Sequence, residues 1–187
     1  MMPDTKLYII RHGRAEGNKI NSSLLCPEGK IQAERLSDFL LQRNITNVNQ
    51  LISSPFLRAK QTAKVISEKL HLECSIEDRL REIDLDEIND NEHLAEKIKE
   101  QFEDFSLKLI GNESNQDVMD RLGTLKDDLL QRGGTFLLVT HSVAMTLLLR
   151  HFDSSRFGVE EWGKITYPDV YLVTLTNNNI NIEHIWK

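Results

Sequence analysis

The chain has 187 residues, of which 40% are hydrophobic and 28% charged, with a formal net charge of -6. This length suits a single domain with its own core, and the acidic balance argues against a nucleic-acid-binding surface, which needs clustered cations. No apolar run reaches the roughly 20 residues that span a bilayer. The widely separated Cys26 and Cys74 are typical of reduced thiols, which indicates a cytoplasmic protein. Together, these features lead us to expect no membrane and no nucleic-acid partner.

Apolar strands alternate with amphipathic helices along the chain. Strands are expected at 7–10, 51–53, 73–76 and 135–140, helices at 27–40, 59–70, 118–130 and 143–152, and a closing hairpin at 170–176 and 180–185. Ile31, Ala33, Leu36, Phe39 and Leu40 carry the apolar spacing of the first helix. This alternation predicts an α/β fold, a three-layer sandwich with a mainly parallel central sheet flanked by helices.

One segment departs from this alternation. Residues 84–104 are rich in acids and contain only two basic residues, Lys97 and Lys99. We expect one or two exposed helices on a helical excursion at about 84–116, within a single domain covering 1–187.

Residues with reactive or charged side chains follow the expected parallel strands. Arg11 and His12 follow the first strand, Arg58 lies shortly after the second, Glu82 after the third, and His141 after the fourth. The carboxyl ends of parallel strands meet at one edge of the sheet, where ligands bind. We therefore expect an active site at the carboxyl edge.

These residue types suit phosphoryl transfer. Arginine forks bind phosphate oxygens, an imidazole can attack phosphorus, and a carboxyl group can protonate a leaving oxygen. The helices that begin near Arg58 and Ser142 are expected to direct amide N–H groups at an anion. Positive charge around the phosphate would replace Mg²⁺, so we expect no metal and no cofactor. A P-loop lysine motif is absent from the sequence.

The motifs resemble those of the histidine phosphatase superfamily, the phosphoglycerate mutase-like proteins. The matching residues, in family order, are Arg11-His12-Gly13 after 7–10, then Asn18, Gly29 with Gln32 and Ala33, the block 53–63, Leu80-Arg81-Glu82, and Val139-Thr140-His141-Ser142. A lone Arg-His-Gly would be weak, but ordered blocks over most of the chain are specific.

The resemblance implies a role for each matching residue. It implies His12 as the nucleophile and Glu82 as the proton donor. The remaining positions would contact the phosphate and are Arg11, Arg58, Asn18, His141 and Ser142, with His141 also catalytic. Neutral His12 would attack phosphorus while Glu82 protonates the leaving alcohol, and water would then hydrolyse the phosphohistidine.

The chain departs from the family pattern at several positions. Ala15 stands where many members carry Ser or Thr, and Arg14 where an acid is common. The run after Glu82 lacks the usual Gly/Trp pattern, which leaves Asp84 as a second candidate acid. The segment after Glu82 is short for a mutase, which favours release of phosphate.

The function expected from the resemblance is hydrolysis of phosphate monoesters of small phosphorylated metabolites. The alternatives are a phosphoglycerate mutase-type phosphotransferase, a protein phosphohistidine phosphatase and a non-catalytic scaffold of the same fold. A metal enzyme with His12 and His141 as ligands is disfavoured by the neighbouring arginines. The sequence does not indicate an oligomeric state.

Overall fold

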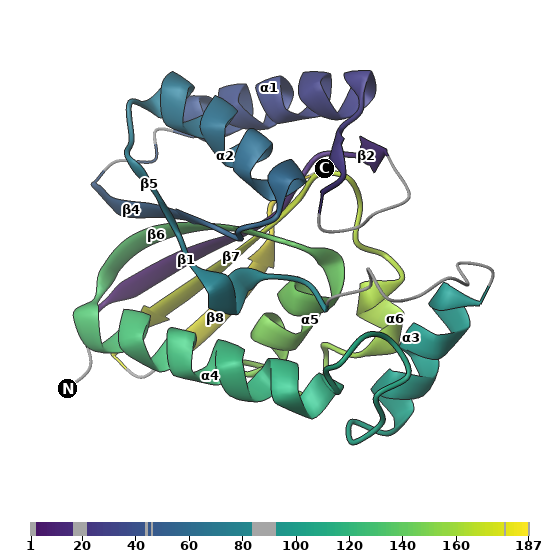
Figure 1. Ribbon diagram of the computed structural model, residues 1–187. Coiled ribbons are helices and arrows are strands. Elements are labelled where there is room, and N and C mark those ends of the chain that lie inside the picture. Colours follow the sequence, from purple (N-terminus) through teal and green to yellow (C-terminus); the bar gives the residue numbers. More distant parts are fainter. Residues whose placement is uncertain are drawn as a thin grey trace.

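A six-stranded sheet forms the centre of the computed structural model, which describes residues 3–16, 22–43, 45, 47–83, 93–177 and 179–186 (Figure 1). The strands, in spatial order, are β5 (Cys74–Ile76), β4 (Val48–Ser53), β6 (Gly134–Thr140), β1 (Thr5–Arg11), β7 (Asp169–Thr176) and β8 (Asn179–His184). β5, β4, β6 and β1 are parallel, whereas β7 runs antiparallel to both β1 and β8. The predicted, mainly parallel sheet is confirmed.

Helices cover both faces of the sheet and complete the predicted three layers. Figure 1 shows α1 (Pro27–Gln42) and α2 (Leu57–Leu70) on one side, and α4 (Asn115–Arg132) and α5 (Ser142–Arg150) on the other. The alternation of side chains along β1 serves both layers: Leu7 and Ile9 pack towards α4 and α5, and Tyr8 and Ile10 towards α1 and α2. In the described ranges, no helix is long and apolar enough to cross a membrane.

The predicted excursion contributes to the core. Residues 84–92 lie outside the described part of the chain, and α3 (Leu94–Glu103) follows them. The expectation of an exposed helix is wrong for α3, because Ile98 and Phe102 are buried in the cluster shared with α4 and α5. These two residues are four apart and therefore share one face of the helix, whereas Glu96, Lys99 and Glu100 are exposed.

The sequence pattern does not predict the shortest elements or the exposure of the Ile31 side chain. The unpredicted elements are β2 (Ala15–Glu16), β3 (Leu24–Leu25), a 3₁₀ helix (Asp78–Leu80) and α6 (Val159–Trp162), each too short to show a period. Ile31 is 55% exposed, although the sequence pattern predicts it among the inward-facing apolar residues of α1. The buried stripe runs through Ala33, Leu36 and Leu40 at spacings of three and four, and Ile31 lies off it.

Candidate active site

The carboxyl edge of the sheet brings the predicted residues together. β1 ends at Arg11, and the next amide, that of His12, donates to the carbonyl oxygen of Thr140 at the end of β6, 3.1 Å away. The amide of Ser54, just past β4, donates to the Val139 carbonyl oxygen at 2.9 Å. These bonds align three strand ends. One cavity of about 450 Å³ opens there, and its lining includes Arg11, His12, Arg58, Glu82, His141 and Ser142.

Two motif glycines let the loop that carries His12 pack closely on α1. A Cβ atom on Gly13 would lie 2.5 Å from the carbonyl oxygen of Gly29, and a Cβ atom on Gly29 would collide with the carbonyl oxygen of Arg14. Both obstacles are backbone atoms, which cannot rotate away as a side chain does. The amide of Gly13 also donates to Oγ1 of Thr62 on α2, at 3.2 Å. Glycine at positions 13 and 29 therefore permits the close approach between this loop and α1.

His12 is held as one neutral tautomer. Its Nδ1 lies 2.6 Å from the carbonyl oxygen of Gly13, and its Nε2 lies 2.9 Å from Nε of Arg58. A carbonyl oxygen only accepts and a guanidinium only donates, so Nδ1 carries the proton and Nε2 presents its lone pair. Burial, together with the charges of Arg58 and Arg11, holds the pKa of His12 well below 6.5 despite the bond to Gly13. The ring is therefore a neutral nucleophile at neutral pH.

Arg11 supplies a fixed, buried positive charge. Its Nη1 donates to the carbonyl oxygens of Ile165 at 2.8 Å and Thr166 at 3.1 Å, and its guanidinium carbon lies 3.4 Å from the ring centroid of Tyr167. Its Nε is buried without a hydrogen-bond partner among the described residues. Burial lowers the pKa of Arg11, with Tyr167 and Glu82 acting against it, and the guanidinium stays charged. An unpaired N–H beside a cavity is suited to an anionic oxygen.

His141 is the second neutral imidazole of the site. Its ring centroid lies 4.9 Å from that of His12, and its Nε2 lies 2.7 Å from Oγ of Ser54. Burial, followed by the charge of Arg58, holds the pKa of His141 well below 6.5. In the described part of the chain its Nδ1 is buried without a partner. The cavity floor thus combines two guanidinium charges with two imidazoles, a setting that attracts a dianion.

Glu82 is buried at the start of α5. Its Oε2 accepts from the amide of Val143 at 2.9 Å, and its Oε1 accepts from the amides of Ala144 at 3.1 Å and Ile83 at 3.3 Å. Two amides of α5 that were expected to face an anion therefore bond this carboxylate instead. Ser142, the first residue of α5, does line the cavity. The three bonds fix the direction of the Glu82 carboxylate beside the cationic floor.

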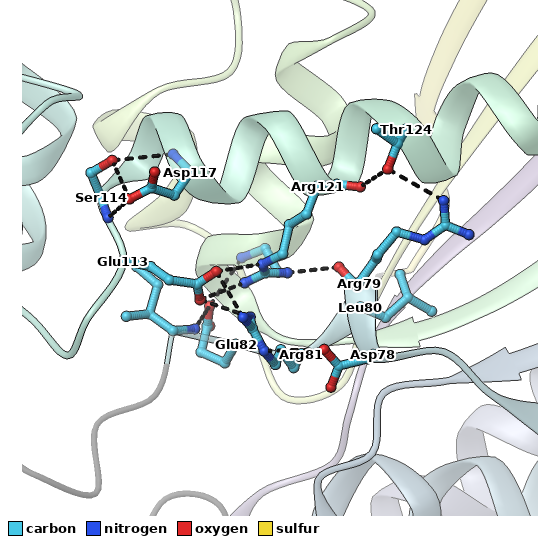
Figure 2. Close-up of polar contacts among 12 residues, drawn as sticks. Asp78, Arg79, Leu80, Arg81, Glu82, Glu113, Ser114, Asp117, Arg121 and Thr124 are labelled. Atoms are coloured by element: carbon cyan, nitrogen blue, oxygen red, sulfur yellow. Dashed lines mark hydrogen bonds and ion pairs between the residues drawn. The ribbon is translucent and has the colours of Figure 1, made fainter.

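A network of ion pairs supports the segment before Glu82, as Figure 2 shows. Two nitrogens of Arg81 donate to the two oxygens of Glu113 at 2.8 and 2.9 Å, and Arg121 donates to the same carboxylate at 2.9 and 3.2 Å. Arg121 also donates to the carbonyl oxygen of Arg79 at 2.6 Å. Glu113 immediately precedes Ser114, whose capping box with Asp117 begins α4. The network ties the segment carrying Glu82 to the first turns of α4.

Several residues of the site carried no sequence signal. Tyr167 and Glu113 stand in no pattern that marks them as functional, and only their contacts reveal them. Ser54 lies in the matching block 53–63, but its contact with His141 is not predicted by the sequence. Asn18 and the alternative acid Asp84 lie outside the described residues. The residues that the structure describes include no group of three or more His, Cys, Asp or Glu able to hold a metal ion.

The family follows from this geometry together with the sequence match. The model of the histidine phosphatase superfamily (branch 1) matches residues 7–185. The chain belongs to this superfamily. The predicted membership of this enzyme superfamily is therefore confirmed, and His12, Arg11 and Arg58 occupy the edge of the sheet expected from the family motifs.

Proteins with known names or structures resemble the chain over most of its length. "Probable phosphoglycerate mutase GpmB" from Salmonella choleraesuis (strain SC-B67) is 26% identical over 176 residues, which cover 85% of this chain and 78% of the relative. The phosphoglycerate mutase of Bacillus anthracis str. Sterne aligns with a TM-score of 0.77 at 19% identity, over 98% of this chain and 93% of that one. A mycobacterial glucosyl-3-phosphoglycerate phosphatase aligns with a TM-score of 0.75 at 20% identity, over 98% of this chain and 99% of that one. The structural likenesses support the fold.

Proposed function

We propose that this protein is a metal-independent phosphomonoesterase that acts on small phosphorylated metabolites through a phosphohistidine at His12. The observation that carries the proposal is the neutral His12, which presents the lone pair of Nε2 beside two buried arginines. A carbonyl oxygen holds the opposite nitrogen, so the ring is already in its attacking tautomer. An imidazole in this setting needs no base to activate it.

Substrate binding begins with an exchange of hydrogen bonds. In the structure, Arg58 donates to the nitrogen that must attack. An incoming phosphate dianion gives Arg58 a stronger, charge-assisted acceptor, so the guanidinium moves from Nε2 to a phosphate oxygen and releases the lone pair. Nε of Arg11 and Nδ1 of His141, which have no hydrogen-bond partner among the described residues, supply two further contacts at the same end of the cavity.

The chemical reaction has two steps. Nε2 of His12 forms a bond to phosphorus as the bond to the ester oxygen breaks, and Glu82 gives a proton to that oxygen. The phosphorylated ring is stabilised by the carbonyl oxygen of Gly13, which accepts the hydrogen bond of Nδ1. Glu82 then takes a proton from water, which attacks phosphorus and breaks the bond to nitrogen.

A phosphoglycerate mutase is a second candidate, because two of the similar proteins carry that name. A mutase keeps the phosphoryl group on its histidine until a second position of the substrate accepts it, which requires cations at both ends of the cavity. Among the described lining residues, the permanent cations are Arg11 and Arg58, and both lie beside His12. This distribution supports release of phosphate.

The absence of nucleic-acid and membrane partners and the cytoplasmic location stay predictions from the sequence.

Hydrolysis of p-nitrophenyl phosphate tests the proposal. Wild type, His12→Asn and the exposed control His71→Asn are assayed with and without EDTA. His71 has a positive φ of 54°, which asparagine tolerates. We expect EDTA-resistant hydrolysis by wild type and by the control, and loss of at least about a thousandfold in His12→Asn. Activity that survives in His12→Asn, or that EDTA removes, contradicts the proposed mechanism.

A further inference from the structure

The cavity has two chemically different ends. The end beside His12 is polar and positively charged, as described above. The other part of the lining comes from α3, the loop after it and α6, and its side chains are Leu94, Ala95, Ile98, Ile110 and Trp162. Acidic and basic residues of α3, including Glu96, Lys99 and Glu100, are absent from the lining and are exposed. This apolar side of the cavity is referred to below as the apolar wall.

The apolar wall is a packed part of the fold. Ile98 and Ile110 are 8% and 1% exposed and belong to the main core cluster. Trp162 packs against Phe102 of α3, with ring centroids 6.2 Å apart. Gln101 accepts from the amides of Leu109 and Ile110 at 2.9 and 2.8 Å, which fixes the loop after α3. Nε1 of Trp162 is buried without a hydrogen-bond partner among the described residues, so the wall presents a defined, largely apolar surface that includes one N–H donor.

We propose that the leaving group of the substrate is uncharged and largely apolar, an alkyl or aryl alcohol esterified to a single phosphate. This inference rests on the proposed function and specifies its substrate class. Phosphate bound between Arg11 and Arg58 directs the ester oxygen away from His12, because attack is in line with the leaving group. The carbon skeleton of the alcohol then lies against the apolar wall, where burial of each methylene stabilises the bound state.

A second anionic group on the leaving alcohol is disfavoured by the same lining. The described residues of the apolar wall include no cation, so a carboxylate or a second phosphate placed there would lose its water without gaining a positive partner among them. The remaining titratable carboxyl group of the described lining, Glu82, supplies no positive charge either. The described lining therefore favours an uncharged leaving group over phosphorylated hydroxy acids or bisphosphates.

A series of primary alkyl phosphates from ethyl to octyl tests the inference directly. The basicity of the leaving alcohol hardly changes along the series, so changes in kcat/KM report contact with the apolar wall. We expect kcat/KM to rise about two- to fourfold per methylene until the wall is covered. Phosphoserine and 3-phosphoglycerate serve as anionic comparison substrates, with kcat/KM at least about tenfold below that of butyl phosphate.

Ala95 offers a matched pair of variants, because it lines the cavity yet is exposed, so the fold tolerates a larger side chain. Ala95→Lys introduces a cation and is expected to raise kcat/KM for 3-phosphoglycerate about threefold or more while lowering it for hexyl phosphate. Ala95→Gln has similar length without charge and is expected to lower the value for hexyl phosphate and leave 3-phosphoglycerate unimproved.

The outcomes separate this inference from the proposed function. A flat alkyl series, or a preference for anionic esters in the wild type that depends on His12, overturns the apolar leaving group and leaves the phosphohistidine mechanism standing. A wild type that hydrolyses no ester and forms no phosphohistidine overturns both. A rising series together with the Ala95→Lys switch supports the assignment.

Discussion

Replacing Glu113 by glutamine tests the ion-pair network behind Glu82. Arg81 and Arg121 both bond this carboxylate, and Arg121 also holds the carbonyl oxygen of Arg79. Glutamine keeps the size and one carbonyl oxygen but removes the charge that two arginines share. We expect a loss of stability together with a less well-positioned Glu82.

The magnitude follows from how much water reaches the network. The side chains of Glu113, Arg121 and Arg81 are 15%, 12% and 27% exposed. Removing one partner of a buried pair costs about 3–5 kcal/mol, and an exposed pair contributes about 0–1 kcal/mol. This intermediate exposure places the loss of unfolding free energy at about 2–3 kcal/mol, which lowers Tm by about 5–10 °C in a chain of this size.

Thermal unfolding and substrate kinetics provide the assay. Glu28→Gln is the matched control, because Glu28 pairs with Arg14 at 3.0 Å and both side chains are more than half exposed; we expect it to change Tm by less than about 2 °C. In Glu113→Gln, kcat for butyl phosphate should fall more than kcat for p-nitrophenyl phosphate, whose leaving group needs no proton. Equal Tm values for the two variants, with unchanged kcat on both substrates, would refute the reasoning.

Three further predictions follow from the site. Glu82→Gln should lower kcat for alkyl phosphates by about 10²–10⁴-fold and for p-nitrophenyl phosphate by far less; equal losses in steady-state assays would argue against proton donation. The folded-state pKa values of His12 and His141 lie well below 6.5, so the unfolded chain binds their protons first. The free energy of unfolding that depends on these residues is therefore fully present above pH 6.5 and is lost below it, by at most about 1.4 kcal/mol per pH unit for each histidine. Urea unfolding should show a shallower fall of the unfolding free energy with decreasing pH in His141→Asn, and the same dependence on pH as in the wild type would contradict this. Inorganic phosphate at a hundred times its Kd for the wild type should raise the wild-type unfolding free energy by about 2.7 kcal/mol. The same phosphate concentration should not stabilise Arg58→Met, and calorimetry can check both results.

The sequence predicts the parts of the site that are tied to strand ends. Arg11, His12 and His141 directly follow or end apolar strands, so the parallel sheet itself brings them together. The position of Arg58 at this edge is also predictable, because its helix begins four residues after β4 ends. The register of the sheet leaves little freedom at these positions, which is why local pattern and topology suffice.

Other features depend on contacts that have no local period. Glu113 lies 32 residues from Arg81, and their pairing depends on where the segment after α3 returns to α4. The amides of Val143 and Ala144 in α5 donate to Glu82, which lies 61 and 62 residues earlier in the chain. Two amides that the sequence predicts to face an anion therefore bond a carboxylate of the protein itself. The buried face of α3 is hidden in the sequence because the segment 84–104 as a whole is rich in acids, although Ile98 and Phe102 have the spacing of a buried stripe.

The most direct test of the central claim is chemical identification of the phosphorylated residue during turnover. Wild-type protein mixed with p-nitrophenyl phosphate is quenched within milliseconds in alkaline denaturant, and its peptides are analysed by mass spectrometry. We expect a phosphoryl group on His12 that survives base and is lost in acid, and no such group in His12→Asn. Turnover without labelling of His12, or stable phosphate on another residue such as Ser54, would contradict the phosphohistidine mechanism.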